Sequence, residues 1–339
     1  MVKIKDVAAM AGVSPATVSR VMMNKGNISE KTRAKVLRNV DLLGYRPNAL
    51  AKQLRQQRTH TVYVIVPNFN NSFFYEVCRG IESVALDNQY QIYLVNANND
   101  KSQESLYISA LMQKQTDGII SISAVAAMNV VEQQIVGLPM VISCQYLENC
   151  SIPNVAIDNV LAATEATAHL VDLGHRKIGH LSGPANHVLY RDRLTGYLRA
   201  LTEKQVEVDM NYVSFGDSTF MSGYERTLEL LNGYKEITAI FASGDSMAIG
   251  AMKAAKELGR RIPEDCAVVG FDDLEIASFC DPPLTTIQQP TMEIGIQSMQ
   301  LLLDLIQKKT TEHQRLLDYK LIVRGSTVKD KTTAHPLFA

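Results

Sequence analysis

IKDVAAMAGVSPATVSRVMMN, residues 4–24, decides how this chain begins to fold. Apolar residues at positions 4, 7, 8 and 11 follow the i, i+3, i+4, i+7 spacing, which predicts a helix over 4–11. Gly12 can end that helix in the left-handed conformation, and Ser14 can cap a second helix with Pro15 in its first turn. The second helix buries Val18 and Val21, and its outer face presents Pro15, Ala16, Thr17, Ser19 and Arg20.

A third helix is expected from the cap Ser29 to Gly44, packed through Val36 and Val40. Three short helices with a glycine turn between the first two indicate a helix-turn-helix, whose second helix enters the DNA major groove. In that role Arg20 would pair with guanine, and phosphates would be bound by Thr17, Ser19 and Asn24. The same periodicity also suits a three-helix bundle that binds no DNA.

The charge of the chain is divided between its two parts. Residues 1–60 hold twelve Lys/Arg and three Asp/Glu, a net of +9, so residues 61–339 carry −10 within a total of −1. Clustered cations favour DNA, because counterions are released when they neutralise phosphates. The distribution therefore supports a DNA-binding head on an acidic body.

Composition excludes several other classes of protein. The 339 residues exceed one compact domain, and neither a membrane-spanning stretch nor a signal peptide is recognisable, so we expect a cytoplasmic protein. Five cysteines without a CxxC pair and seven scattered histidines indicate neither disulfides nor a metal site. The sequence contains neither a GxGxxG motif nor a Walker A loop, so it indicates no nucleotide cofactor. Gly244-Asp245-Ser246 approaches the nucleophile elbow of α/β hydrolases but lacks the final glycine, so an enzyme is only a distant alternative.

From residue 61 short apolar runs alternate with amphipathic stretches, first over 61–158 and again after 160. This βαβ rhythm predicts two doubly wound lobes with parallel sheets, like a periplasmic binding protein. Strands are expected over 61–67, 91–97, 117–123, 139–144, 154–158, 177–182, 210–215, 237–242, 266–271 and 317–324. Helices are expected over 72–88, 160–173, 188–203, 219–233, 245–258 and 291–308.

Ligands of such sheets bind beyond the carboxyl ends of the strands. That rule places an effector in the cleft between the lobes, lined by Asn71, Phe73, Phe74, Ser123, His187, Arg193, Asp272 and Gln289. Tyr190, Asp158 and Asp245 are further candidates, although Asp245 and Asp272 can instead cap the next helix or turn. Aromatic rings beside amides, an arginine and an aspartate suit a ligand with hydroxyls and an apolar face.

The run over 4–24, together with the later Gly44-Tyr45-x-Pro47-Asn48-x-x-Ala51-x-x-Leu54, resembles the signature of the LacI/GalR repressor family. The resemblance continues to about Thr327 through motifs such as Val269-Gly270-Phe271-Asp272. It implies an allosteric repressor that binds double-stranded operator DNA as a homodimer, reading bases with Pro15, Ala16 and Arg20. Ala51 and Leu54 would lie in a hinge helix, with Leu54 wedged into the minor groove. An ordinary linker over 48–60 is the alternative.

Together these patterns predict five segments. They are a head over 1–47, a hinge over 48–60, a first lobe of 61–159 plus 291–316, a second lobe of 160–290 plus 317–330, and a tail over 331–339. Within the family, the stretch from Phe279 to Pro290 is similar to a nucleoside-responsive member, so a nucleoside is the first candidate effector and a sugar the alternative. Cys144-Gln145 and His187 differ from the residues of purine-sensing members, which argues against guanine or hypoxanthine.

Overall fold

The computed structural model describes residues 2–24, 26–46, 58–67, 69, 71–97, 100–122, 137–147, 150–309 and 313–329. These residues form two compact units, Met1–Thr59 and His60–Ala339. None of the helices within the described ranges is long and apolar enough to cross a membrane.

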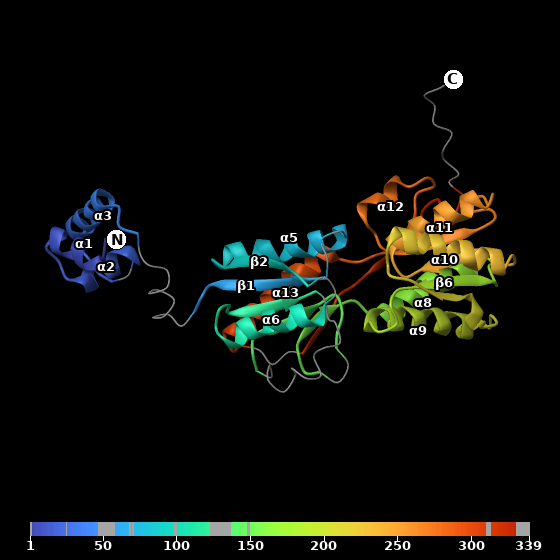
Figure 1. The fold of residues 1–339 in the computed structure, drawn as a ribbon, viewed down its shortest axis with the longest axis horizontal. Helices are drawn as coiled ribbons and strands as arrows, with labels where there is room; N and C mark the ends of the chain where they lie inside the picture. Colours follow the sequence, from blue (N-terminus) through green and yellow to red (C-terminus); the bar gives the residue numbers. More distant parts are fainter. Residues whose placement is uncertain are drawn as a thin grey trace, which may run out of the picture. The chain divides into compact units, whose positions relative to one another are not determined.

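The first unit is the expected three-helix head (Figure 1). Its helices are α1 (Ile4–Ala11), α2 (Pro15–Met22) and α3 (Glu30–Leu43). Gly12 ends α1 with φ +65°, and the Ser14 side chain accepts a hydrogen bond from Thr17 N at 3.1 Å. Their apolar faces meet in one small core of Val7, Ala8, Ala11, Val18, Val21, Val36 and Val40. The predicted bounds of the first and third helices and the predicted start of the second are confirmed, because caps and turns are set by local sequence.

The second unit holds two six-stranded sheets with helices on both faces (Figure 1). The first sheet has the order β11-β5-β4-β3-β1-β2 and parallel pairing throughout the registers observed. Its strands are β1 (Thr61–Val66), β2 (Gln91–Asn96), β3 (Gly118–Ser121), β4 (Met140–Ser143), β5 (Asn154–Ala156) and β11 (Gln314–Leu316). Its helices are α5 (Ser72–Asp87), α6 (Lys101–Met112) and α13 (Thr291–Ile306). We call this sheet and these helices the first lobe.

Successive side chains of a strand point to opposite faces of the sheet, and this alternation gives the first lobe two hydrophobic cores, one on each face. Val62, Val64 and Val66 of β1 pack with α5 and α13, whereas Ile65 packs in a second core with residues of α6. Helices α5 and α13 meet at two glycines, where a Cβ on Gly80 would lie 2.1 Å from Met292 O and one on Gly295 2.1 Å from Val77 O. Only glycine permits this close approach, which fixes the amino end of α5 above the sheet.

The second lobe has the sheet order β12-β10-β9-β8-β6-β7. Its strands are β6 (Ile178–Ser182), β7 (Val213–Phe215), β8 (Ala239–Ala242), β9 (Ala267–Asp272), β10 (Thr285–Gln288) and β12 (Lys320–Ile322). Its helices are α8 (Asn159–Asp172), α9 (Val188–Glu203), α10 (Phe220–Gly233), α11 (Asp245–Glu257), the short α12 (Glu275–Phe279) and a 3-10 turn at Met210–Tyr212. Figure 1 shows α8 and α9 on one face of this sheet and α10 and α11 on the other.

The two predicted α/β lobes with parallel sheets are confirmed, with two corrections. The strand predicted over 317–324 in the second lobe is observed as the shorter β12 at Lys320–Ile322, and a separate strand, β11 at Gln314–Leu316, joins the first sheet. Strand β12 also runs antiparallel to β10, since the chain returns to this sheet at its edge. Strands β10 and β11 and helix α12 were not predicted.

Candidate functional site

The head presents one face of α2 to solvent. Pro15, Ala16 and Arg20 are exposed, whereas Thr17 and Ser19 are half-buried. The planar guanidinium of Arg20 has the donor geometry that pairs with the O6 and N7 atoms of guanine. Asn24 was predicted to bind phosphate, and its side-chain oxygen accepts a hydrogen bond from Arg33 Nη1 at 2.6 Å, so only its amide nitrogen is left to contact DNA. Ala51 and Leu54 lie outside the described residues.

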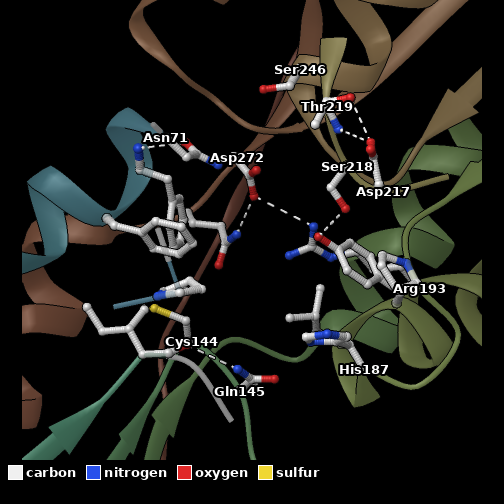
Figure 2. Close-up of a pocket in the computed structure, with 18 of the residues that line it drawn as sticks. Asn71, Cys144, Gln145, His187, Arg193, Asp217, Ser218, Thr219, Ser246 and Asp272 are labelled. Atoms are coloured by element: carbon white, nitrogen blue, oxygen red, sulfur yellow. Dashed lines mark hydrogen bonds and ion pairs between the residues drawn. The ribbon is translucent and has the colours of Figure 1, made fainter. Parts of the chain in front are cut away.

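The body contains a cavity of about 300 Å³ where the carboxyl ends of the strands of both sheets meet (Figure 2). The first lobe contributes Pro67, Asn71, Phe73, Phe74, Ile122, Cys144 and Gln145. The second lobe contributes Pro184, His187, Leu189, Tyr190, Arg193, Asp217, Ser218, Thr219, Phe220, Ser246 and Asp272, and Gln289 follows β10 at the crossover to α13. The rule that ligands bind beyond the strand ends therefore identifies this cavity.

A buried ion pair lies at its centre. Arg193 is 5% exposed, and its Nη1 lies 3.7 Å from Asp272 Oδ1 (Figure 2). The Arg193 Nε donates to Asn159 Oδ1 at 2.9 Å, Nη1 donates to the Ser243 carbonyl at 2.5 Å, and the guanidinium stacks on the Phe271 ring. These contacts fix the guanidinium before any ligand arrives, so its orientation costs nothing on binding.

The carboxylate of Asp272 sits on an unusual backbone. Asp272 has φ +120° and Asp273 has φ +54°, conformations that residues other than glycine rarely adopt. Burial raises the pKa of Asp272 to about 6, although Arg193 and a hydrogen bond from Gln289 Nε2 at 2.7 Å oppose the rise. Asp272 is therefore largely ionised at neutral pH and can accept hydrogen bonds from a ligand.

Asp245 lies beneath this turn and holds it in place. Its carboxylate is fully buried, accepting hydrogen bonds from Leu274 N at 2.7 Å and from Thr286 Oγ1 at 2.6 Å. It is not among the residues that line the cavity. Asp158, another candidate, caps α8 through Leu161 N.

Seven of the eight predicted effector residues line the cavity: Asn71, Phe73, Phe74, His187, Arg193, Asp272 and Gln289. Ser123 lies outside the described residues. The segment Asp217–Phe220 also lines the cavity but was not predicted, although it follows the expected strand 210–215 and the same strand-end rule applies to it. Its Ser218 hydroxyl donates to Tyr190 Oη at 2.6 Å, which ties this loop to α9.

Among the described residues, no group of three or more His, Cys, Asp and Glu side chains could hold a metal ion. Cys78, Cys144, Cys266 and Cys280 are free thiols. Burial raises the pKa of Cys78 to about 11, which keeps that thiol protonated.

Comparison with known proteins matches both parts of the chain. Residues 3–48 match the family described as bacterial regulatory proteins, lacI family, and residues 167–327 match the periplasmic binding protein-like domain. The HTH-type transcriptional repressor CytR of Escherichia coli (strain K12) is 38% identical over 96% of each chain.

Solved structures give the same result. The structure of the Lac repressor dimer bound to operator and the anti-inducer ONPF is similar with a TM-score of 0.87 and 30% identity, covering 96% of this chain and 99% of that one. A complex of the transcriptional regulator CelR with cellobiose is similar with a TM-score of 0.72 and 32% identity, covering 96% of this chain and all of that one.

Proposed function

The chain belongs to the LacI family of bacterial regulatory proteins, and we propose that its cavity binds a nucleoside or a sugar that changes its affinity for operator DNA. Members of this family are transcriptional repressors with a DNA-binding head and an effector-binding body, and this chain is one of them. The observation that carries the proposal is the cavity itself, in which a fixed Arg193–Asp272 pair faces aromatic rings of both lobes.

A nucleoside is the first candidate effector. The stretch from Phe279 to Pro290 resembles that of the cytidine repressor, and Phe73, Phe74, Tyr190 and Phe220 offer rings for stacking on a base. Arg193, Asp272 and Gln289 offer polar partners for ribose hydroxyls. A sugar is the second candidate, favoured by the similarity to a regulator solved in complex with cellobiose.

Ligand and DNA would act through linkage. If the effector and the operator prefer different arrangements of the same lobes, each changes the affinity of the other by one coupling free energy. We propose that the exposed face of α2 reads operator DNA, with Arg20 as its base-contacting cation, and that the protein acts as a cytoplasmic homodimer. In this role the cavity binds and senses, without catalysis or a cofactor.

The test is a thermal-shift screen of the full chain against nucleosides, sugars and sugar phosphates. A ligand that binds only the folded state increases the free energy of unfolding, by about 2.7 kcal/mol at a concentration of a hundred times its Kd, and so raises the melting temperature. We expect a hit among the nucleosides, with sugars as the second outcome. Silence across all panels would contradict the proposed ligand class.

A further inference from the structure

The turn that brings Asp272 to the cavity is held in a conformation that its own residues disfavour. Asp272 has φ +120° and Asp273 has φ +54°, so two successive residues other than glycine lie outside the ordinary backbone regions. Such a backbone costs free energy and persists only where the contacts around it fix it. Asp245 supplies one such contact from α11, because it accepts a hydrogen bond from Leu274 N. Asp273 supplies another.

Asp273 forms a second ion pair of the second lobe, with Arg324. Arg324 Nη2 lies 2.8 Å from Asp273 Oδ1, and the side chains of Arg324 and Asp273 are only 20% and 11% exposed. Gln288 Nε2 donates to the other oxygen of this carboxylate, Asp273 Oδ2, at 2.8 Å. Neither Asp273 nor Arg324 is among the described residues that line the cavity. The pair can therefore act on a ligand only indirectly, through the turn.

Arg324 is itself fixed by the neighbouring strand. Its Nη1 donates to the Leu284 carbonyl at 2.9 Å, and its backbone N donates to Thr285 Oγ1 at 2.8 Å. A planar guanidinium binds two acceptors in a fixed geometry, so it sets the position of the Asp273 carboxylate relative to the start of β10. Arg324 thus ties the turn after β9 to the strand next to it in the sheet.

We propose that Arg324 is a positioning residue of the cavity, which holds the strained turn and so places the Asp272 carboxylate beside Arg193. The direct partners of Asp272 are Arg193 Nη1 at 3.7 Å and Gln289 Nε2 at 2.7 Å, so Arg324 acts on Asp272 through the backbone of the turn. The inference rests on the proposed function for what the cavity binds, and it adds a residue outside the cavity on which that binding depends.

A double-substitution cycle in the full chain tests this route. Cytidine and ribose, which represent the two proposed ligand classes, are titrated by calorimetry into the wild type, Arg324→Leu, Asp272→Asn and the chain that carries both substitutions. If Arg324 acts through Asp272, Arg324→Leu weakens binding at least ~10-fold in the wild-type background and less than ~2-fold in the Asp272→Asn background. Unchanged affinity of Arg324→Leu, or equal losses in both backgrounds, would overturn the proposal.

Arg261→Leu is the matched control for the loss of an ion pair. Arg261 also pairs with an aspartate of the second lobe, since its Nε and Nη2 donate to Asp265 at 2.8 and 2.9 Å. Neither residue lines the cavity, and the Arg261 side chain is 72% exposed. Arg261→Leu is expected to bind both probes within ~2-fold of the wild type. A loss as large as that of Arg324→Leu would contradict a specific role of Arg324.

A crystal structure of Arg324→Leu without ligand decides the question independently of any probe. We expect the backbone at Asp272 and Asp273 to leave the region of positive φ, and the Asp272 carboxylate to move away from Arg193. A turn that superposes on that of the wild type would overturn the proposal even if the affinity falls. If Arg324→Leu does not fold, Arg324→Lys, which keeps the cation but not the planar fork, takes its place in both experiments.

The two experiments also separate this inference from the proposed function. If the wild type binds neither cytidine nor ribose, that result counts against the proposed ligand classes, and the crystal structure alone decides whether Arg324 positions the turn. If the wild type binds a probe and the turn of the variant is unchanged, the proposed function stands and the role of Arg324 is refuted.

Discussion

The two walls of the cavity differ in chemistry although the two lobes share one architecture. The described lining residues of the first lobe are apolar or neutral, with Phe73 and Phe74 on α5 and Gln145 after β4. The second lobe supplies the charges, with Arg193 on α9, Asp217 after β7 and Asp272 at the end of β9. Among the described lining residues the charges come from the second lobe, whereas both lobes supply aromatic rings, so a ligand that stacks on Phe73 or Phe74 and also pairs with a charge must engage both lobes.

The difference also extends beneath the surface. The charged wall is supported by buried partners, such as Asn159 under Arg193 and Asp245 under the turn after Asp272. The apolar wall rests on ordinary core packing. We therefore expect substitutions in the second lobe to affect folding and binding together, and those in the first lobe to affect binding more selectively.

The largest effect is expected for Arg193→Leu. It leaves Asp272 as a buried carboxylate without its cation and removes the donors to Asn159 and Ser243, so the free energy of unfolding should fall by about 3–5 kcal/mol. Urea denaturation measures this loss. The control on the same helix is Arg199→Leu, whose solvent-exposed pair with Glu203 should contribute little to stability. If both variants lost the same free energy of unfolding, the buried contacts of Arg193 would stabilise the protein no more than an exposed ion pair does, which would contradict this prediction.

An intermediate effect is expected for Phe74→Ala on the apolar wall. Phe74 is half-buried and lines the cavity, so its loss should weaken the ligand by roughly tenfold through lost ring contact. Calorimetry with the ligand found in the screen measures the change. Tyr75→Ala is the control, because the neighbouring Tyr75 is 64% exposed and does not line the cavity. Equal affinities of Phe74→Ala and the wild type would show that the first lobe contributes no contact area.

The last prediction concerns the pH dependence of stability. The folded-state pKa of Asp272 is about 6 against an ordinary value of 3.8, so the folded protein binds the proton more tightly than the unfolded chain. Stability from this group is fully present below pH 3.8 and is lost as the pH rises to about 6. Asp272→Asn removes the titration and tolerates a positive φ.

Urea unfolding at a series of pH values checks this expectation. The stability of the wild type relative to Asp272→Asn should fall between about pH 4 and pH 6 and stay level above that range. A difference that rises through this range would mean that the pairing with Arg193 outweighs burial.

Much of this arrangement follows from the sequence, because the features that determine it are local. Gly12, Ser14 and Pro15 predict the turn of the head, and apolar runs followed by polar residues predict both the strands and the cavity residues after them. The role of Asp245 depends on partners about thirty and forty residues away in the chain, Leu274 and Thr286, which no local pattern indicates. The hydrogen bond from Gln145 Nε2 to the Ile122 carbonyl of another strand end is likewise indicated by no local pattern.

The most direct test of the account is the DNA affinity of the full chain with and without the ligand. Fluorescence anisotropy on a DNA duplex selected by the protein from a random-sequence library supplies the readout. The account predicts that saturating ligand changes the affinity at least about fivefold, and that Phe74→Ala requires roughly tenfold more ligand for the same change. A ligand that fills the cavity by calorimetry and leaves the DNA affinity unchanged would contradict it.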